Sequence, residues 1–470
     1  MVDIRFGTDG WRGVIARDFT FENLSLVAQA TMEYLIREKM DDRGIVIGYD
    51  RRFLSREFAR HVATVAAGHG VRVSLADRVA PTPALSWSVR DRNAAAGVMI
   101  TASHNPPEYN GFKIKESFGG SARPSTTAVV EGIVRENLSA GQPVASLPFD
   151  EGVRRGIITL FDPLPSYLDQ LRRFVDMDAI RRAGLSIAVD PMHGAGSGIF
   201  TLLLGGVTEI HDEENPGFRG ISPEPTPDTL QELGELVRTG GYRVGLALDG
   251  DADRIGAVDE KGEFFSSHMI FTLILRHLVE RRAMRGGVVK TVSTTRMIDC
   301  LAGKYGLTLY ETPIGFKHIC ELMLEKDILM GGEESGGLGV TRHLPERDGL
   351  LLGLLLLETI AFTGKGVRAQ LDDIMDEIGR FSYRRIDLAI DQRRKDALIA
   401  TLSASLPETV AGMPVVTTNS ADGFKFIFSD GSWLLIRPSG TEPVLRLYAE
   451  APTTGQVDRL LGAARDLASL

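Results

Sequence analysis

The feature that most constrains the fold is a short strand pattern that occurs three times, each time opening with a glycine followed by aliphatic residues. The pattern lies at Gly44–Asp50 (GIVIGYD), Gly184–Asp190 (GLSIAVD) and Gly287–Val292 (GVVKTV). Segments with the periodicity of a helix lie between the strands, for example residues 22–40 and 55–68. Strands that alternate with helices are typical of α/β units with parallel sheets. The recurrence predicts that similar α/β domains are used more than once.

The length of 470 residues is too great for one hydrophobic core, so the chain is expected to divide into domains. Beyond Tyr383 the pattern changes to short strands with two helices, which predicts a compact α+β domain with an antiparallel sheet. Gly141–Phe149 has the composition of a linker. We expect domains at residues 1–150, 151–257, 258–372 and 373–470.

Charge and composition exclude several classes of function. A formal net charge of −9 argues against a nucleic-acid partner and a polybasic membrane anchor. Cys300 and Cys320 form neither a disulfide framework nor a metal-ligand spacing, which favours a reducing compartment. The longest apolar block, Leu350–Leu357, is too short to span a bilayer and is expected to be a buried helix. No signal pattern opens the chain, so we expect a soluble cytoplasmic protein.

A polar loop begins at Thr101, directly after the apolar strand pattern at Ala94–Ile100. Open α/β sheets bind ligands at the carboxyl ends of their strands, so Ser103 is a candidate nucleophile or phosphate carrier. Pro106 and Pro107 restrict the backbone of this loop. An ordinary turn, in which Ser103 and Asn105 cap backbone groups, is the alternative interpretation.

Three aspartates stand at alternate positions after another strand pattern: Asp249, Asp251 and Asp253. Carboxylates held this close repel one another, and a divalent cation removes that cost. Mg²⁺ is favoured because it combines few protein ligands with a substrate oxygen. A calcium loop is an alternative, since Glu260 falls at its last position, but Arg254 stands where that loop needs glycine. A solvated acidic turn without metal is the other alternative.

Two further loops offer groups suited to a phosphorylated sugar. Residues 437–441 combine a guanidinium, two hydroxyls and a glycine, the groups that grip a phosphate. In the glycine-flanked segment 331–337, Glu333 and Ser335 offer hydrogen bonds to vicinal hydroxyls. An ordinary hairpin and an ordinary glycine-rich loop are the alternatives. Isolated cations in other loops, which are most often solvated surface groups, are Arg12, Lys113 and Lys317.

These stretches together predict phosphoryl transfer on a sugar. A metal polarises the transferred group, cations hold its oxygens, and a lysine or histidine moves a proton. At this point the chain resembles the α-D-phosphohexomutase family over essentially its full length. The motifs, in the family's order, are FGTDGWRG, GYDRRFLS, TASHNPPEYNGFKIK, DGDADR, TPIGFKH, GGEESGG and RPSGTEP.

The resemblance implies four domains around a central cleft. The first three are similar mixed-sheet α/β domains with the phosphoserine loop, the metal loop and the sugar-binding loop in turn. The last is an α+β domain with an antiparallel sheet, and it binds a phosphate.

The resemblance also implies a role for each site residue. Ser103 is similar to the serine that is phosphorylated in the active enzyme, and its oxygen completes a Mg²⁺ site with Asp249, Asp251 and Asp253. Arg12 resembles the arginine that contacts the phosphoserine and Lys113 the general acid/base, with His104 adjacent to the chemistry. Substrate contacts are implied for Arg254 and Lys317 as cleft cations, Glu333 and Ser335 at the sugar hydroxyls, and Arg437, Ser439, Gly440 and Thr441 at the distal phosphate.

The implied reaction interconverts hexose 1-phosphate and hexose 6-phosphate through a 1,6-bisphosphate, with glucose 1,6-bisphosphate as activator. The Gly-Phe-Lys of residues 315–317 looks more like glucose-directed enzymes, so phosphoglucomutase is expected. A phosphomannomutase or bispecific enzyme is the alternative, and phosphoglucosamine mutase ranks lower. The expected partner is a small phosphosugar, for a monomer or homodimer that binds neither nucleic acid nor membrane.

Two interpretations from other classes remain open. A serine-dependent metal phosphatase would need Ser103 and the aspartates but no second phosphate grip at Arg437–Thr441. An inactive phosphosugar-binding protein would lack a catalytic residue, and none of those implied by the family is missing here.

Overall fold

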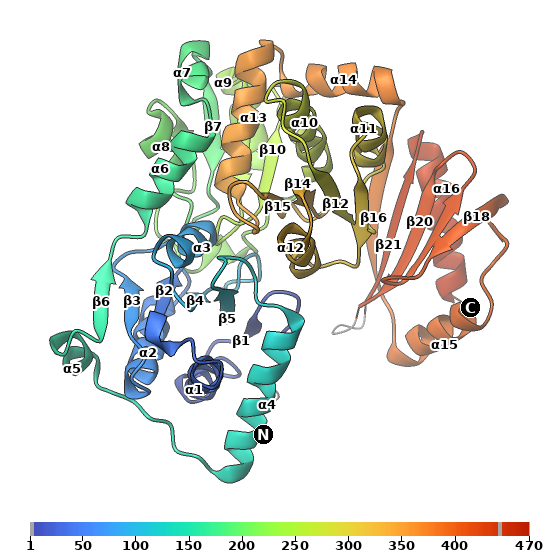
Figure 1. The fold of residues 1–470 in the computed structure, drawn as a ribbon. Coiled ribbons are helices and arrows are strands. Elements are labelled where there is room, and N and C mark those ends of the chain that lie inside the picture. Colours follow the sequence, from blue (N-terminus) through green and yellow to red (C-terminus); the bar gives the residue numbers. More distant parts are fainter. Residues whose placement is uncertain (1–3, 440–443, 470) are drawn as a thin grey trace.

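The computed structural model describes residues 4–439 and 444–469, and this part of the chain forms four successive sheets (Figure 1). Three sheets mix parallel and antiparallel pairs, and the fourth is antiparallel throughout. The predicted fold class, three α/β domains followed by an α+β domain, is confirmed.

The first sheet has the strand order β1-β5-β4-β2-β3-β6. Its parallel strands are β2 (Ile45–Tyr49), β3 (Val73–Ala76), β4 (Ala96–Ile100) and β6 (Ile158–Phe161), and its antiparallel edge is made by β5 (Tyr109–Glu116) and β1 (Trp11–Val14). The helices of this part are α1 (Phe21–Arg37), α2 (Ser55–Gly68), α3 (Thr82–Asp91), α4 (Pro124–Ala140) and α5 (Phe149–Arg154). The carboxyl end of β4 leads directly into the Ser103 loop.

The second sheet has the order β11-β10-β9-β7-β8. Its strands are β7 (Ile187–Asp190), β8 (Thr208–Glu209), β9 (Val244–Leu248), β10 (Ile255–Val258) and β11 (Phe264–Phe265). The helices are α6 (Leu164–Phe174), α7 (Met177–Ala183), α8 (Ile199–Leu204) and α9 (Gln231–Gly240). The aspartate loop fills the connection between β9 and its antiparallel neighbour β10.

The third sheet has the order β13-β12-β14-β15. Its strands are β12 (Gly287–Thr291), β13 (Leu309–Thr312), β14 (Ile328–Gly332) and β15 (Leu338–Val340). The helices are α10 (Ser267–Glu280), α11 (Met297–Tyr305), α12 (Phe316–Glu325), α13 (Gly349–Thr363) and α14 (Val367–Ile378). The second and third parts share one hydrophobic core, because α13 packs its leucines against both.

The apolar block in α13 is a buried helix, as predicted: Leu350–Leu357 is fully enclosed. Asp348 caps its N-terminus by accepting a hydrogen bond from the backbone N–H of Leu351 at 2.9 Å. In the described part of the chain no single helix is long and apolar enough to cross a membrane. By length and composition, α13 and α14 pass such a test only as a pair bent by 79°.

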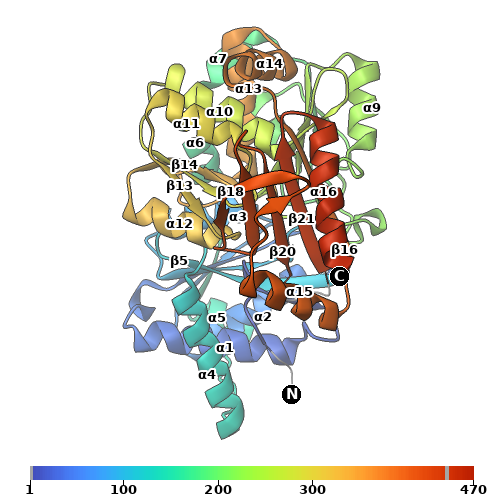
Figure 2. The ribbon, with the colours of Figure 1, turned by 90° about the vertical axis from the view of Figure 1, so that its right-hand side faces the viewer.

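The fourth sheet has the order β16-β21-β20-β19-β18-β17. Its strands are β16 (Ser382–Ala389), β17 (Thr409–Val410), β18 (Met413–Asn419), β19 (Phe424–Phe428), β20 (Trp433–Pro438) and β21 (Val444–Ala451). Figure 2 shows this sheet with α15 (Gln392–Ala404) and α16 (Thr454–Ser469) beside it. Side chains of α16 complete its core.

Sheet membership adds detail to the expected domain ranges. The first sheet continues to Phe161 through the pairing of β6 with β3, and α14 ends at Ile378 before the fourth sheet begins. The boundaries themselves, after residues 150, 257 and 372, stay predictions.

Candidate active site

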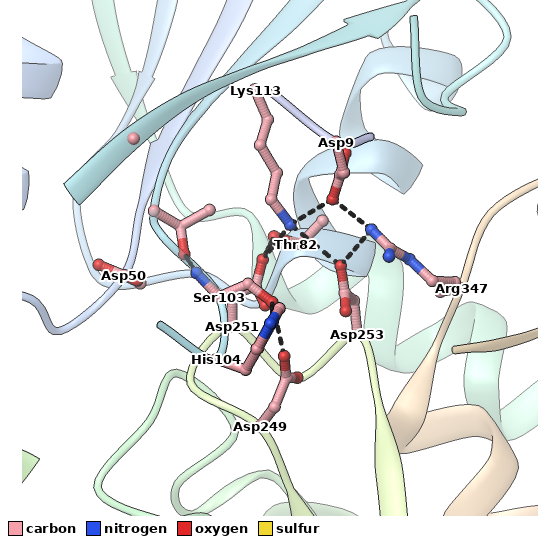
Figure 3. A network of polar contacts seen from close by, with 12 residues as sticks. Asp9, Asp50, Thr82, Ser103, His104, Lys113, Asp249, Asp251, Asp253 and Arg347 are labelled. Atoms are coloured by element: carbon pink, nitrogen blue, oxygen red, sulfur yellow. Dashed lines mark hydrogen bonds and ion pairs between the residues drawn. The ribbon is translucent and has the colours of Figure 1, made fainter. Parts of the chain in front are cut away.

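Loops from the first three parts of the chain meet at one buried polar cluster (Figure 3). The Ser103 loop follows β4, Lys113 lies on β5, the aspartates follow β9, and Arg347 precedes α13. Because β4 and β9 both end at this place, the functional groups lie at the carboxyl ends of strands, where open α/β sheets bind their ligands.

Ser103 is held in a left-handed backbone conformation, with φ of +54°. Its backbone N–H donates to Thr101 Oγ1 at 2.8 Å, and its hydroxyl donates to Asp249 Oδ2 at 2.7 Å. The residue is fully buried. A non-glycine residue in this region of φ is strained, and such strain persists where surrounding contacts determine the conformation. The contacts here aim the hydroxyl at the aspartate loop.

The three aspartates form a buried acidic triad whose ligand oxygens lie within 4.8 Å of one another. Burial, with Asp251 and Asp253 alongside, raises the pKa of Asp249 well above its usual range. Burial also opposes ionisation of Asp251, but Lys113 and the other groups around this carboxyl together outweigh burial and lower its pKa. Among the described residues, Asp251 Oδ1 and Asp253 Oδ1 are buried without a hydrogen-bond partner. Unpartnered carboxylate oxygens are the donors that Mg²⁺ prefers, so the triad fits the ion.

Lys113 lies at the centre of this cluster. Its Nζ is 2.7 Å from Asp9 Oδ2, 2.8 Å from Asp251 Oδ2 and 3.1 Å from Asp253 Oδ2. Burial disfavours the ammonium form, but the three carboxylates outweigh it and raise the pKa of Lys113. The side chain is therefore a positioned, protonated donor beside the serine loop.

Three residues of the cluster are absent from the sequence-based prediction. Arg347 bonds Asp253 at 2.8 Å and also contacts Asp9, and Thr82 donates to Asp251 Oδ2 at 2.5 Å. Asp9 lies inside the motif FGTDGWRG, so that motif was the signal available for it. Arg347 and Thr82 lie in segments without a local chemical pattern, and only the fold brings them to the triad.

Arg12 and His104 flank the serine. The guanidinium of Arg12 donates to Asn105 Oδ1, the side chain two residues beyond Ser103. His104 Nδ1 lies 3.4 Å from Ser103 Oγ. Burial, together with the nearby cations Arg254 and Arg12, holds the pKa of His104 well below its usual range, so the imidazole is neutral.

The sugar-loop candidates lie after β14. Glu333 is buried, and its Oε1 accepts a hydrogen bond from the backbone N–H of Gly315 at 3.0 Å. Burial raises the pKa of Glu333 to about 7. Ser335 lines a cavity of about 590 Å³ that also touches α10 and β16. Lys317 stands in the first turn of α12 and shares a small cavity with Asp9.

The remaining candidates divide between two places. Arg254 bonds Glu224 at 2.8 Å, and its backbone N–H donates to Asp249 Oδ1 at 3.0 Å, so it lies at the triad. Arg437 donates to Asp422 Oδ1 at 2.9 Å, away from the triad. No hydrogen bond or ion pair between described residues joins Arg437 or Glu333 to Ser103.

The C-terminal loop is instead tied to the third part of the chain. Asp422 Oδ2 accepts from the backbone N–H of Ile314 at 2.9 Å, so one carboxylate connects Arg437 with the loop before α12. The carbonyl of Ser439 accepts from Lys395 at 3.0 Å. Gly440 and Thr441, predicted to complete this loop, lie outside the described residues.

Comparison with known proteins matches this arrangement along most of the chain. Four models described as phosphoglucomutase/phosphomannomutase match in order: alpha/beta/alpha domain I at residues 3–140, domain II at 165–262, domain III at 266–378 and the C-terminal domain at 397–467. The chain belongs to the α-D-phosphohexomutase family. Phosphohexomutases are isomerases that transfer a phosphoryl group within the substrate, and this is the enzyme class of the protein.

Relatives that are about 30% identical to this chain are named for several different substrates. A phosphoglucomutase/phosphomannomutase of Thermococcus kodakarensis is 31% identical over 95% of this chain and 94% of its own. A phosphoglucomutase of Komagataeibacter xylinus is 32% identical over 95% of this chain and 87% of its own. A crystal structure from Thermus thermophilus, assigned as a phosphomannomutase, has a TM-score of 0.86 at 35% identity and covers both chains fully. Other phosphohexomutase relatives are named phosphoglucosamine mutase, at 29% identity for that of Acetivibrio thermocellus.

Proposed function

We propose that this phosphohexomutase interconverts glucose 1-phosphate and glucose 6-phosphate, with Ser103 as the phosphoryl carrier. The observation that supports the proposal most directly is the hydrogen bond of 2.7 Å between Ser103 Oγ and Asp249 Oδ2. It holds the hydroxyl of a buried residue with a strained backbone against a triad with two unpartnered oxygens. A phosphoryl group on that hydroxyl would stand beside the cation site and beside Lys113.

The chain's own residues divide the work of the transfer. Asp249, Asp251 and Asp253 would hold Mg²⁺, which when bound neutralises charge on the transferring group. Arg12 lies next to the serine loop and would contact the phosphoryl oxygens. Lys113, as the ammonium, would donate a proton to the sugar oxygen that leaves and, once deprotonated, would accept one from the sugar oxygen that attacks. His104, which is neutral, lies close enough to Ser103 Oγ to orient that oxygen.

Binding of a two-ended substrate needs contacts that serve both orientations. Glu333 and Ser335 would read the sugar hydroxyls, and the loop that begins at Arg437 would hold the phosphate that is not reacting. Phosphoserine would give its group to the sugar, the resulting 1,6-bisphosphate would turn end over end, and its other phosphate would return to Ser103. Glucose 1,6-bisphosphate would therefore activate enzyme that has lost its phosphate.

Glucose is the substrate that we favour. The glucose-like Gly-Phe-Lys at residues 315–317 supports it, as does the Komagataeibacter relative named phosphoglucomutase. Because other relatives are named for mannose and glucosamine phosphates, the test is a side-by-side mutase assay. Glucose, mannose and glucosamine 1-phosphates are supplied with Mg²⁺, and the 6-phosphates are measured. A glucose kcat/KM below that of another sugar would contradict the preference.

The phosphatase alternative makes a different prediction for the same assay. A serine-dependent phosphatase would release inorganic phosphate without forming a 6-phosphate. Isomerisation that proceeds without net release of phosphate, and that a trace of glucose 1,6-bisphosphate accelerates in dephosphorylated enzyme, supports the mutase.

A further inference from the structure

Arg52, which has no role in the site described so far, makes a dense set of hydrogen bonds through its side chain. Its Nη1 donates to the carbonyl oxygens of Pro106 at 2.8 Å and Tyr109 at 3.0 Å. Its Nη2 donates to the carbonyl oxygens of Ser103 at 2.7 Å and Asn105 at 2.6 Å. One guanidinium thus satisfies four carbonyls of the loop that carries Ser103.

Arg52 is itself held by Asp50, the residue that directly follows β2. Its side chain is fully enclosed, and its Nε lies 3.4 Å from Asp50 Oδ2. The other oxygen of Asp50 accepts from the backbone N–H of Arg52 at 2.9 Å and from Ser55 Oγ at 2.7 Å. The guanidinium is therefore anchored to the strand next to β4, and it has little freedom to follow a loop that moves.

The second part of the chain covers the other side of this guanidinium. The ring of Phe218 stacks on it, with 5.0 Å between the ring centroid and Arg52 Cζ. Phe218 has a φ of +45° and is buried, in a turn that precedes the aspartate loop along the chain. A cation enclosed by an aromatic face is attracted to it, and the attraction is stronger where water is excluded.

Four carbonyl dipoles that point at one buried place repel one another unless a cation lies among them. A planar guanidinium has five N–H donors in a fixed fork and can serve all four, whereas a lysine offers a single compact ammonium. The carbonyl of Ser103 belongs to the peptide plane that follows this residue, so Arg52 fixes that plane. The preceding plane carries the N–H of Ser103, which donates to Thr101 Oγ1 at 2.8 Å, so both planes that define the left-handed backbone of Ser103 are restrained.

We propose that Arg52 is a positioning residue for phosphoryl transfer: it locks the loop of Ser103 so that the serine oxygen faces the aspartate triad. Arg52 contacts the loop backbone, and none of its bonds to described residues reaches a side chain of the triad. The proposal rests on the proposed role of Ser103 as phosphoryl carrier. It extends that role by naming what holds the carrier in place.

The test compares Arg52→Lys with a matched control, Arg51→Lys, in the full-length enzyme with Mg²⁺. Arg51 also donates to a backbone carbonyl, that of Asp212 at 2.7 Å, but has no bond to the serine loop. For Arg52→Lys we expect kcat to fall by about 100-fold, the loss typical of a catalytic group displaced by about 1 Å, with KM within about twofold of wild type. The control should keep both constants.

A second measurement separates positioning from general destabilisation. Dephosphorylated enzyme is mixed with glucose 1,6-bisphosphate, and the phosphorylation of Ser103 is followed by intact mass. Arg52→Lys should become phosphorylated about 100-fold more slowly than wild type while its melting temperature shows that it is folded. Phe218→Leu, which keeps all four hydrogen bonds and removes only the stacked ring, should slow phosphorylation in the same direction by less.

The outcomes are distinct. If the wild-type serine becomes phosphorylated and folded Arg52→Lys keeps the wild-type kcat and phosphorylation rate, the positioning role is wrong while the proposed function stands. A loss of kcat/KM that comes from KM alone, with kcat unchanged, also overturns the positioning role. If Arg52→Lys does not fold, an unchanged phosphorylation rate in Phe218→Leu overturns the role. If wild-type Ser103 is never phosphorylated, the proposed function fails, and the positioning role fails with it.

Discussion

The hydroxyl of Ser103 donates to Asp249 at 2.7 Å, although 146 positions separate the two residues along the chain. One lies after a strand of the first sheet and the other after a strand of the second. The contact exists because both strands end at the same interface between two α/β units. It makes the proposed phosphoryl carrier and the proposed metal loop parts of one site.

Replacing the carrier tests the chemistry directly. Ser103→Ala should lower mutase activity by at least about a thousandfold, because the substitution removes the oxygen proposed to carry the phosphoryl group. Binding of glucose 6-phosphate, measured by calorimetry, should survive. Ser88→Ala is the control, since Ser88 donates only within α3, to the carbonyl of Ala84. Normal turnover in Ser103→Ala would contradict the mechanism.

The triad should bind a metal ion, and without that ion its negative charges should destabilise the folded protein. The pKa of Asp249 is raised by burial and by Asp251 and Asp253, so its negative charge is unfavourable in the fold without a cation. Asp249→Asn should therefore melt at or above the wild-type temperature in EDTA. Saturating Mg²⁺, at about 100 times its Kd, should stabilise wild type by about 2.7 kcal/mol, and the variant should lose most of this gain. If Mg²⁺ stabilises the Asp249→Asn variant as much as it stabilises wild type, Asp249 is excluded as a ligand.

Glu333 should make substrate binding depend on pH. Burial raises its pKa to about 7, so the carboxylate proposed to accept hydrogen bonds from the sugar hydroxyls is lost as pH falls from 8 to 6. KM for the phosphosugar should rise by up to about tenfold over that interval, because the ionised fraction falls from about 90% to about 10%. Glu333→Gln removes the titration, and its KM should be flat across the same range. If the variant retains the wild-type pH profile, another group is responsible.

The same shift has a consequence for stability, with the sign fixed by linkage. The pKa of Glu333 in the fold lies above the ordinary value of 4.5. The stabilisation that the protonated Glu333 side chain gives to the fold is therefore present below pH 4.5 and is lost as pH rises through about 7. Glu333→Gln should narrow the difference in unfolding free energy between pH 5 and pH 8.

Arg437 should act on binding more than on chemistry. It lies in the loop proposed to hold the phosphate that does not react, so Arg437→Ala should raise KM by about 10- to 100-fold and change kcat by less than about threefold. Steady-state kinetics with glucose 1-phosphate provide the measurement. Arg394→Ala is a control in the same part of the chain, because Arg394 pairs with Asp391 at an exposed position. A loss seen mainly in kcat would place Arg437 in the transfer step.

A buried hydrogen-bond network should stabilise the junction of the second and third parts. Tyr167 donates to Asp348 Oδ1 at 2.8 Å, and His343 Nε2 lies 2.8 Å from Oδ2 of the same carboxylate. Tyr167→Phe leaves that carboxylate short of a partner and should cost about 1–3 kcal/mol of unfolding free energy.

Urea denaturation of the variant measures this cost. Tyr242→Phe loses only a surface bond to Thr208 and should change the unfolding free energy by less than about 0.5 kcal/mol. Equal effects of the two substitutions would rule out the network as a special source of stability.

The strand patterns and the loop motifs were readable from the sequence because they are local. The aliphatic run before Asp50 and the leucines of α13 specify buried elements whatever lies elsewhere in the chain. Ser103 and the alternating aspartates were recognisable for the same reason. Asp9, Arg347 and Arg52 were not singled out, since their importance comes from distant partners: Arg347 contacts Asp9 across 338 positions.

The sequence by itself determined the order of strands and helices, the four-part division and the residue types available for phosphoryl transfer. Only the tertiary structure decided how those residues behave. Within one short loop, burial and neighbouring carboxylates raise the pKa of Asp249, while Lys113 and the residues around it lower that of Asp251. A local pattern treats the two aspartates alike. Their difference arises because charges from separate sheets are brought within a few ångströms of one another in a buried place, where each interaction is strong.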